Sequence, residues 1–396
     1  MAKWNESKIK DFAEVKGGKR LPKGKQLISE ANSHPYIRIR DLGKSKYLQL
    51  NSEYGYVDDE TQKTIERYIV NKGDILISVV GTIGLVGIVG DTLDNANQTE
   101  NCDKIINIKG LNPEYLYYYL ISSLGQEEIK RATVGAVQPK LPLKNVQDIT
   151  VKYPSKETQD KIVGILSSID EKIATNEAIN NNLQAQAKAI FEERFINIKE
   201  VPEGWERGNL LDIANYLNGL AMQKFRPKDD EIGIPVMKIK ELRQGSCDSN
   251  SEFCSPNIKP AYIIQDGDVI FSWSGSLLVD IWCGGKCGLN QHLFKVTSEN
   301  YDKWFYYLWT SYHLDRFIAI AADKATTMGH IKRDELSKAE VLIPTPTDYE
   351  ELNTIMNPIF ELIISNRIES RKLAILRDEL LPKLMSGEIN ISEVTI

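Results

Sequence analysis

The sequence predicts a mixed α/β fold, in which two similar globular domains are joined by two long helices that form an antiparallel coiled coil with a pseudo-twofold internal repeat. Three observations lead to this prediction. A chain of 396 residues is too long for one ordinary core and suits two or three domains. Two long segments carry apolar residues at the heptad spacing of a paired helix. The segments that precede them repeat one another in order, so both halves follow one plan.

The first long helix is predicted over Glu157 to Phe191 and the second over Leu352 to Leu381. Their apolar residues alternate steps of four and three, which places them on one helix face. The two patterns correspond at a constant offset of 190 residues. A helix with one apolar seam needs a partner, so we expect the two helices, the first a rod of about 50 Å, to pair. The seam residues are Ile162, Leu166, Ile169, Ile173, Leu183, Ala187 and Ile190, then Leu352, Met356, Ile359, Ile363, Leu373 and Leu380.

Polar residues interrupt both seams at matching places. Asn176 aligns with Asn366, and Asn180 aligns with Ser370. We expect Asn176 and Asn366 to be buried amides that fix the register of the helix pair. The alternative is that they are exposed and mark where the helices bend or fray.

Two further residues depart from a regular repeat. Pro358 lies inside the second helical pattern, where it predicts a kink or a later start of the helix. Arg377 aligns with Ala187, and there the correspondence lapses.

Upstream of each helix the same elements recur. A short strand closed by a proline comes directly before each helix, where proline does not break a strand ladder. The aromatic clusters YLYYYLI and WFYYLW are predicted helices that pack on each sheet. The matched segments are DITVKYP with KAEVLIP, NKGDILISVVGTIG with QDGDVIFSWSGSLL, HPYIRIRDL with IPVMKIKEL, and KIKDFAEVKGG with NLLDIANYLNG. We therefore divide the chain into a first domain (1–154), a long helix (155–199), a second domain (200–346), and a second long helix with the C-terminal tail (347–396).

The glycine-rich stretch DILISVVGTIGLVGIVG from Asp74 is predicted to be a hairpin of two buried strands. Its glycines are spaced by three, so it lacks the G-x-G pair of a dinucleotide-binding loop, and no Gly-Lys-Ser/Thr follows. It is also too short and glycine-rich to span a bilayer. In the second copy the turn GTIG is replaced by Ser272-Trp273-Ser274-Gly275. Similar strands with different turns suggest that each turn makes different contacts.

Charge and cysteine content narrow the function classes. The net charge of −6 argues against a protein that coats nucleic acid without specificity, although lysines and arginines cluster locally. The N-terminal residues are polar and lack an export signal, so we expect a cytoplasmic protein with reduced thiols. The alternative is a zinc site formed by Cys247, Cys254, Cys283 and Cys287, which lacks a tight C-x2-C pair. The four histidines suggest neither a metal site nor a catalytic triad.

Taken together, these motifs resemble the specificity subunit of type I restriction-modification enzymes. The residues that carry the resemblance are the G-D-[IV]-[LI]-[IF]-S-x-x-G motifs at Gly73 to Gly81 and Gly267 to Gly275, the prolines Pro154 and Pro344, VPEGWE from Val201, and LLPKLMSGEI from Leu380. The resemblance covers nearly the whole chain. One departure is Glu157-Thr158-Gln159, where the family often has Glu-Gln after the proline.

The resemblance implies a non-catalytic chain that reads DNA. Each globular domain would be a target-recognition domain for one half of a bipartite, asymmetric site, and the helices would set the unread spacer. It further implies two modification methyltransferase subunits docked around the helices, with restriction translocase subunits added to them. This chain would hold no cofactor, whereas S-adenosylmethionine, ATP and Mg are expected on the partner subunits.

Residues suited to contact DNA lie at matching places in both halves. Lysine, arginine, serine, threonine and amide groups bind phosphates and base edges. Arg38 and Arg40, and likewise Lys238 and Lys240, would share one face of a strand. The alternative for every one of these residues is ordinary surface charge or packing. The candidates are Lys19, Arg20, Lys23, Lys25, Arg38, Arg40, Thr82, Gln138 and Lys140 in the first domain, and Lys224, Arg226, Lys238, Lys240, Trp273, Ser274, His330 and Lys332 in the second.

Two other functions compete with this reading. The segment Asn112-Pro113-Glu114-Tyr115 is near the N-P-P-Y motif of adenine-N6 methyltransferases, which would make the chain a stand-alone enzyme. Against this, Glu114 replaces the second proline, and Asn112 is a good cap for a helix that begins at Pro113. The second competitor is a scaffold that binds only protein, for which long paired helices would serve equally well.

Overall fold

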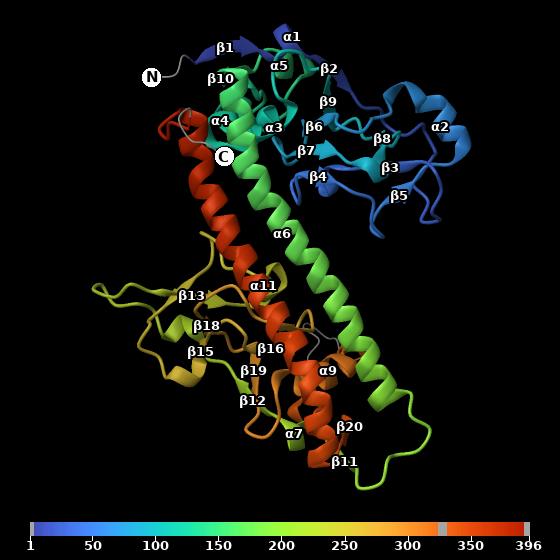
Figure 1. Ribbon diagram of the computed structural model, residues 1–396, viewed down its shortest axis with the longest axis vertical. Coiled ribbons are helices and arrows are strands. Elements are labelled where there is room, and N and C mark those ends of the chain that lie inside the picture. Colours follow the sequence, from blue (N-terminus) through green and yellow to red (C-terminus); the bar gives the residue numbers. More distant parts are fainter. Residues whose placement is uncertain (1–3, 324–330, 392–396) are drawn as a thin grey trace. The chain divides into compact units, whose positions relative to one another are not determined.

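The computed structural model describes residues 4–323 and 331–391, and it divides into two compact units (Figure 1). The first unit comprises Met1–Glu171 with Ala374–Ile396, and the second comprises Lys172–Leu373. Each of the two long helices, α6 (Lys156–Phe191) and α11 (Pro346–Ser386), contributes residues to both units. No helix within the described ranges is both long enough and apolar enough to cross a membrane.

The strands of the first unit form three sheets. The five-stranded sheet has the order β2-β9-β6-β7-β4, the three-stranded sheet has the order β5-β3-β8, and β1 pairs with β10. The strands are β1 (Asn5–Lys8), β2 (Glu14–Gly17), β3 (Pro35–Ile37), β4 (Tyr47–Leu48), β5 (Gly55–Tyr56), β6 (Ile75–Ser78), β7 (Val86–Val89), β8 (Asn97–Gln98), β9 (Cys102–Ile106) and β10 (Thr150–Tyr153). The predicted hairpin is confirmed, since β6 and β7 pair antiparallel with Ile75 opposite Ile88.

Helices cover the large sheet of the first unit. Helix α3 packs its tyrosines into the core that holds the apolar residues of β6, β7 and β9, as its aromatic sequence predicts. The core also takes in Leu381, Leu384 and Met385 from the end of α11. The short helices of the first unit are α1 (Ile9–Phe12), α2 (Asp59–Ile65), α3 (Pro113–Ile121), α4 (Ser123–Ala132) and α5 (Leu143–Gln147), of which α2 packs instead against Tyr36 of the three-stranded sheet.

The second unit repeats this arrangement. Its sheets have the orders β12-β19-β16-β17, β14-β13-β18-β15 and β11-β20, and its helices are α7 (Leu210–Ile213), α8 (Ile239–Gln244), α9 (Lys303–Tyr312) and α10 (Leu314–Asp323). The strands are β11 (Glu206–Asn209), β12 (Asn215–Asn218), β13 (Ile234–Met237), β14 (Phe253–Cys254), β15 (Ile263–Ile264), β16 (Val269–Ser272), β17 (Leu278–Ile281), β18 (Cys287–Leu289), β19 (Leu293–Thr297) and β20 (Glu340–Ile343). The order β2-β9-β6-β7 thus recurs as β12-β19-β16-β17. The predicted mixed α/β class with a duplicated domain and two long helices is confirmed.

The second long helix corrects the expectation for Pro358. Helix α11 runs from Pro346 to Ser386, so Pro358 does not mark a later helix start. Proline removes one backbone donor and normally weakens a helix interior. Here Pro358 is exposed, while Met356 and Phe360 on either side of it are buried in the core of the second unit. Their burial holds the helix together across the missing hydrogen bond.

Asparagines occupy the buried seam between α6 and α11 in the second unit. Asn176, Asn180 and Asn366 are 1%, 6% and 8% exposed, which excludes the alternative of frayed, solvated positions. Asn366 Nδ2 donates to Asn180 Oδ1 at 3.0 Å, and Asn176 Nδ2 donates to Glu369 Oε2 at 2.8 Å. Buried amides that bond across a helix pair fix its register, because any slip leaves them without partners.

The strands predicted to present paired cations end earlier than expected. Strand β3 ends at Ile37, and Arg40 lies in a short 3-10 helix, η1 (Ile39–Asp41). In the second unit β13 ends at Met237, and Lys240 lies in α8. The cause is local: the backbone N–H of Arg38 donates to Asp41 Oδ2 at 2.7 Å, and that of Lys238 donates to Glu241 Oε2 at 3.1 Å. An acidic residue three positions on starts a helical turn in place of the strand.

Removing one of the seam amides is expected to weaken the helix pair. In Asn366→Ala, Asn180 loses its buried partner, which costs about 1–3 kcal/mol. The midpoint of urea unfolding, followed by circular dichroism, should fall. Asn181→Ala is the matched control, because Asn181 is exposed on the same helix as Asn180. Equal effects of the two substitutions would contradict a role for the seam amides.

Candidate nucleic-acid interface

The turn between β6 and β7 is held by a buried serine. Ser78 is fully buried, and its hydroxyl donates to the Thr82 carbonyl at 2.6 Å while accepting from the Leu85 N–H at 2.9 Å. Gly81 and Gly84 have φ angles of 76° and 87°, a region that favours glycine. Thr82 is exposed at the turn. The serine and glycines of the repeated motif therefore present Thr82 on a rigid support.

Two other candidate segments meet this turn in the first unit. A Cβ at Gly81 would lie 3.6 Å from Ile39 Cδ1, so the turn lies against the residue between Arg38 and Arg40. Val80 forms a β-bridge with Lys140, and the Leu141 N–H donates to the Val79 carbonyl at 2.9 Å. The structure thus brings together Thr82, Arg38, Arg40, Gln138 and Lys140, which the sequence places far apart.

The second unit brings the corresponding segments together in the same way. A Cβ at Gly275 would lie 3.5 Å from Ile239 Cδ1, between Lys238 and Lys240. The Ile331 N–H donates to the Trp273 carbonyl at 3.1 Å, which places the exposed Lys332 beside this turn. The candidate His330 lies outside the described residues.

The basic segment of each unit follows a glycine that packs against the backbone of a neighbouring segment. The Lys19 N–H donates to the Gln98 carbonyl at 3.4 Å, and the hydroxyl of Tyr36 donates to the Lys19 carbonyl at 3.1 Å. A Cβ at Gly18 would lie 2.0 Å from the Thr99 carbonyl oxygen, and one at Gly219 would lie 2.2 Å from that of Asn290. Only glycine allows this approach. The segments that follow carry Lys19, Arg20, Lys23 and Lys25, or Lys224 and Arg226.

Most of the candidate cations already have acidic partners. The ion pairs are Arg20 with Glu100 (2.7 Å), Lys25 with Asp58 (3.0 Å) and Glu60 (2.6 Å), Lys238 with Glu252 (2.6 Å), Arg226 with Glu252 (3.6 Å), and Lys240 with Asp248 (3.0 Å). Their hydrogen bonds to lysine hold the pKa of Glu252 and of Asp248 below the ordinary values. Exposed pairs of this kind contribute little to stability, so a phosphate can replace the carboxylate at small cost.

Four candidate lysines have no ion pair within 4–323 and 331–391. These are Lys23, Lys140, Lys224 and Lys332, all exposed. Lys19 lies over the ring of Tyr68, 5.7 Å from its centroid.

The guanidinium groups of Arg38 and Arg40 converge on one acceptor. Their Nη2 atoms donate to the Glu53 carbonyl at 2.6 and 2.8 Å, and Asp41 lies within ion-pair distance of both. Sequence reasoning missed Glu53, Asp248 and Glu252 as partners of the cations. The aligned acids Asp41 and Glu241 in RIRD and KIKE were visible in the sequence, but the loop acids carry no recognisable signal.

Trp273 and Ser274 form the support of their turn rather than an exposed tip. Trp273 is half-buried, its indole N–H donates to Asn218 Oδ1 at 3.0 Å, and its ring packs 5.7 Å from that of Phe294. Ser274 is 4% exposed, and its hydroxyl lies 3.0 Å from His292 Nδ1. Contact of these two side chains with DNA stays a prediction that would require the turn to adjust.

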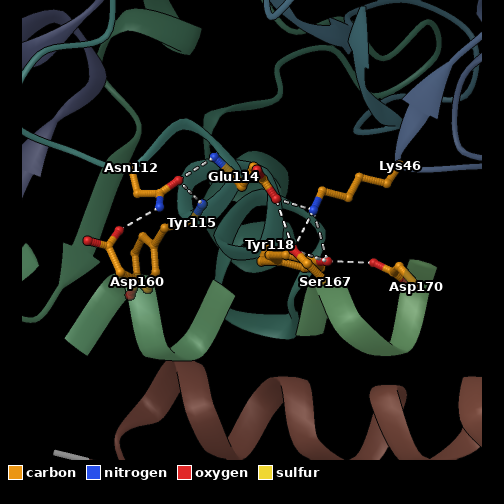
Figure 2. Close-up of polar contacts among 8 residues, drawn as sticks. All are labelled: Lys46, Asn112, Glu114, Tyr115, Tyr118, Asp160, Ser167 and Asp170. Carbon is orange, nitrogen blue, oxygen red and sulfur yellow. Dashed lines mark hydrogen bonds and ion pairs between the residues drawn. The ribbon is translucent and has the colours of Figure 1, made fainter. Parts of the chain in front are cut away.

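The N-P-E-Y segment is occupied by structural contacts (Figure 2). Asn112 Oδ1 caps α3 by accepting from the Glu114 N–H at 2.9 Å, and Asn112 Nδ2 donates to Asp160 Oδ1 at 2.7 Å. The Tyr115 hydroxyl donates to the Lys152 carbonyl at 2.9 Å. An amide engaged on both sides has no group left to hold an adenine, so the methyltransferase reading has no support here.

Glu114 belongs instead to a partly buried polar network of the first unit (Figure 2). Lys46 is 8% exposed and pairs with Glu114, and its ammonium also donates to Ser167 Oγ at 2.7 Å. The Tyr118 hydroxyl donates to Asp170 Oδ2 at 2.6 Å. Burial and this hydrogen bond raise the pKa of Tyr118. The network ties the loop before β4 to α3 and α6.

Arg377 completes this network and explains why the helical repeat lapses there. Arg377 Nη1 donates to Asp170 Oδ1 at 3.0 Å. Its aligned residue Ala187 is instead buried in the apolar core of the second unit. The two units therefore attach their helices through different chemistry.

No group of three potential metal ligands among histidine, cysteine, aspartate and glutamate is close enough to hold an ion in the part of the chain that the structure describes. The zinc alternative for the four cysteines of the second unit therefore has no support.

The family described as "Type I restriction modification DNA specificity domain" matches residues 1–185 and 202–375. The match covers most of the chain in two copies, so the chain belongs to this family, and the resemblance seen in the sequence is confirmed. The family is one of DNA-recognition subunits, which are not themselves catalysts.

Named relatives agree with this membership. The chain is 28% identical over 415 residues to the "Type I restriction enzyme MjaIX specificity subunit" of Methanocaldococcus jannaschii, covering 99% of this chain and 94% of that protein. It is 21% identical to the HindI specificity subunit of Haemophilus influenzae, covering 90% and 95%. The crystal structure of a type I restriction-modification S subunit from M. genitalium shares the fold with a TM-score of 0.59 at 16% identity, covering 97% of this chain and 96% of that one.

The partly buried polar network gives a stability prediction for the first unit. Tyr118→Phe removes the hydrogen bond to Asp170 and should lower the free energy of unfolding by about 1–2 kcal/mol. Tyr117→Phe is the control. Tyr117 is the residue next to Tyr118, and its hydroxyl makes no hydrogen bond within the described residues. Thermal unfolding of the two variants should differ, and a loss of the same size in both would show that the network contributes nothing specific.

Proposed function

We propose that this chain is the DNA sequence-recognition subunit of a cytoplasmic type I restriction-modification complex. The proposal rests on the duplicated assembly of a turn, a cation pair and a basic segment at matching places in two copies of one domain. In each copy a buried serine holds the turn, Ser78 by donating to the Thr82 carbonyl and Ser272 by donating to the Ser274 carbonyl at 3.3 Å. We assign residues 1–154 and 200–346 to the two target-recognition domains, 155–199 to the first helical region, and 347–396 to the second helical region and tail.

The two assemblies differ in the groups they offer to DNA. The first unit presents two arginines, whose forked donors suit the two acceptors of guanine, whereas the second presents two lysines, which are compact point charges. The turns also differ, with Gly-Thr-Ile-Gly in one copy and Ser-Trp-Ser-Gly-Ser in the other. Different donors on one frame favour two different half-sites, and hence a bipartite, asymmetric DNA site.

The long helices have a separate role in the proposal. A pair of helices with a fixed register is suited to set the number of unread base pairs between the half-sites and to dock two modification methyltransferase subunits. Restriction translocase subunits would join through these. Because the family consists of non-catalytic recognition subunits, S-adenosylmethionine, ATP and Mg would act on the partner subunits.

Sequencing of modified bases tests this proposal in a host that expresses the chain with its methyltransferase partner. The expected result is a new N6-methyladenine motif made of two different half-sites separated by an unspecified spacer. A palindromic motif would contradict the two different half-sites. The absence of any new motif, together with binding of partners alone, would favour a scaffold that binds only protein.

The unpaired lysines give a prediction about salt dependence. Lys140→Ala and Lys332→Ala should each weaken binding to duplex DNA and reduce the slope of log affinity against log salt by about one, because each removes one phosphate contact. Fluorescence anisotropy with a labelled duplex at several salt concentrations measures this slope. Lys152→Ala is the control, because Lys152 lies on β10, next to the start of α6, and pairs with Glu6 at 3.1 Å. If Lys152→Ala reduced the slope of log affinity against log salt by the same amount, the placement of the interface would be contradicted.

A further inference from the structure

Two cysteines of the second unit lie together beside the candidate DNA-contacting helix α8. Cys247 is half-buried in the loop after α8, and Cys287 is fully buried in β18. Cys247 packs against the apolar cluster that contains Cys287, and the two thiols share a hydrogen bond. The chain segments that carry them also meet, since a Cβ at Gly284 would lie 2.8 Å from the Gly245 carbonyl oxygen.

The shared hydrogen bond makes the two thiols chemically unequal. It lowers the pKa of Cys247, and the same bond together with burial raises the pKa of Cys287. A partly exposed thiol with a lowered pKa is the member of a pair that reacts first, and a buried neighbour then resolves the product. The other thiols of this unit, Cys254 and Cys283, are both buried, and burial raises the pKa of each to about 11.

The loop that carries Cys247 also carries the acidic partners of the candidate cations. Asp248 pairs with Lys240 at 3.0 Å, and Glu252 pairs with Lys238 at 2.6 Å. Ser251 Oγ donates to Glu241 Oε1 at 3.1 Å and holds the loop against α8. For a phosphate or base edge to take over these lysines, the loop must yield its carboxylates. The first unit has a single cysteine, Cys102, which is buried in β9, so it has no counterpart of this pair.

We propose that Cys247 and Cys287 form a reversible disulfide that fixes the loop 245–252 with its carboxylates against Lys238 and Lys240. The oxidant is a low-molecular-weight disulfide. The Cys247 thiolate attacks one of its sulfurs and expels a thiolate, and the Cys287 thiol, on losing its proton, then attacks the Cys247 sulfur and expels the second. The pair loses two electrons and two protons, and the oxidant is reduced to two free thiols. The consequence for DNA rests on the proposed function: oxidation weakens recognition by the second domain and leaves the first unchanged.

The chemical step is tested on the full chain by incubation with oxidised glutathione, followed by non-reducing peptide mapping. The expected product is the peptide pair that joins Cys247 to Cys287, which dithiothreitol reverses, and which is absent in Cys247→Ser and retained in Cys254→Ser and Cys283→Ser. A glutathione adduct on Cys247 without the cross-link, a cross-link that involves Cys254, or no modification would each overturn the proposal.

The effect on DNA is tested with a duplex that carries the motif found by sequencing of modified bases, the experiment that tests the proposed function. The oxidised chain should bind about tenfold more weakly than the reduced chain, the equivalent of one lost contact of about 1.4 kcal/mol, whereas Cys247→Ser should bind equally under both conditions. A cross-linked chain with unchanged affinity would overturn the role of the loop. If no form binds the duplex, the proposed function fails, while the peptide map still decides whether the disulfide forms.

Discussion

The pairing of α6 with α11 is the constraint on which both globular cores depend. In the first unit the core that covers the large sheet includes Leu166 from α6 and Leu384 from the far end of the chain. In the second unit the core includes Phe191 from α6 and Phe360 from α11. Each unit therefore needs residues from both long helices to bury its apolar surface. Because the seam amides Asn180 and Asn366 allow only one register, the same pairing that closes the second core also fixes which residues close it.

The duplicated frame carries different attachments in its two copies. In the first unit the helices are held by a polar network around Lys46, Asp170 and Arg377. In the second unit an aromatic contact joins Tyr307 to Phe360 at 5.6 Å, and Arg371 binds Asp266 at 2.7 Å. The strand order β2-β9-β6-β7 of the first domain recurs as β12-β19-β16-β17 in the second, although these contacts differ. What the copies share is the support of the turn, whereas the residues that project from it differ, as expected of two readers of different sequences.

Much of this architecture was readable from the sequence because periodic burial leaves a direct trace in it. The heptad seams, the proline-ended strands and the hairpin at Ile75 are all expressed in local patterns. The contacts of Lys46 were not predictable, since its partners Glu114 and Ser167 lie far along the chain and only the fold brings them near. Arg377 is an intermediate case. The interrupted repeat singled it out in the sequence, but nothing in the sequence indicated that it binds Asp170.

Where prediction failed, a local interaction outweighed the pattern. The RIRD and KIKE segments suggested longer strands, but the carboxylates of Asp41 and Glu241 accept backbone N–H groups and start helical turns. Pro358 suggested a kink or a later start of the helix, and the later start is wrong because α11 continues through it, with its neighbours buried in the core. For the candidate site, the residue types and their matching positions could be read from the sequence. The acidic partners of the cations could not, because they lie in loops whose course only the structure shows.

If the two turns contact different halves of one DNA site, site-specific photocross-linking will distinguish their contacts. A cross-linking amino acid is placed at the exposed Thr82 or at Ser276, which is exposed in the matching turn between β16 and β17. The assembled complex is then irradiated on a duplex that carries the motif found by sequencing of modified bases. We expect the probe at Thr82 to cross-link bases of one half-site and the probe at Ser276 to cross-link bases of the other. Cross-links from both probes to the same half-site, or none from either while a probe at Lys152 reacts, would contradict it.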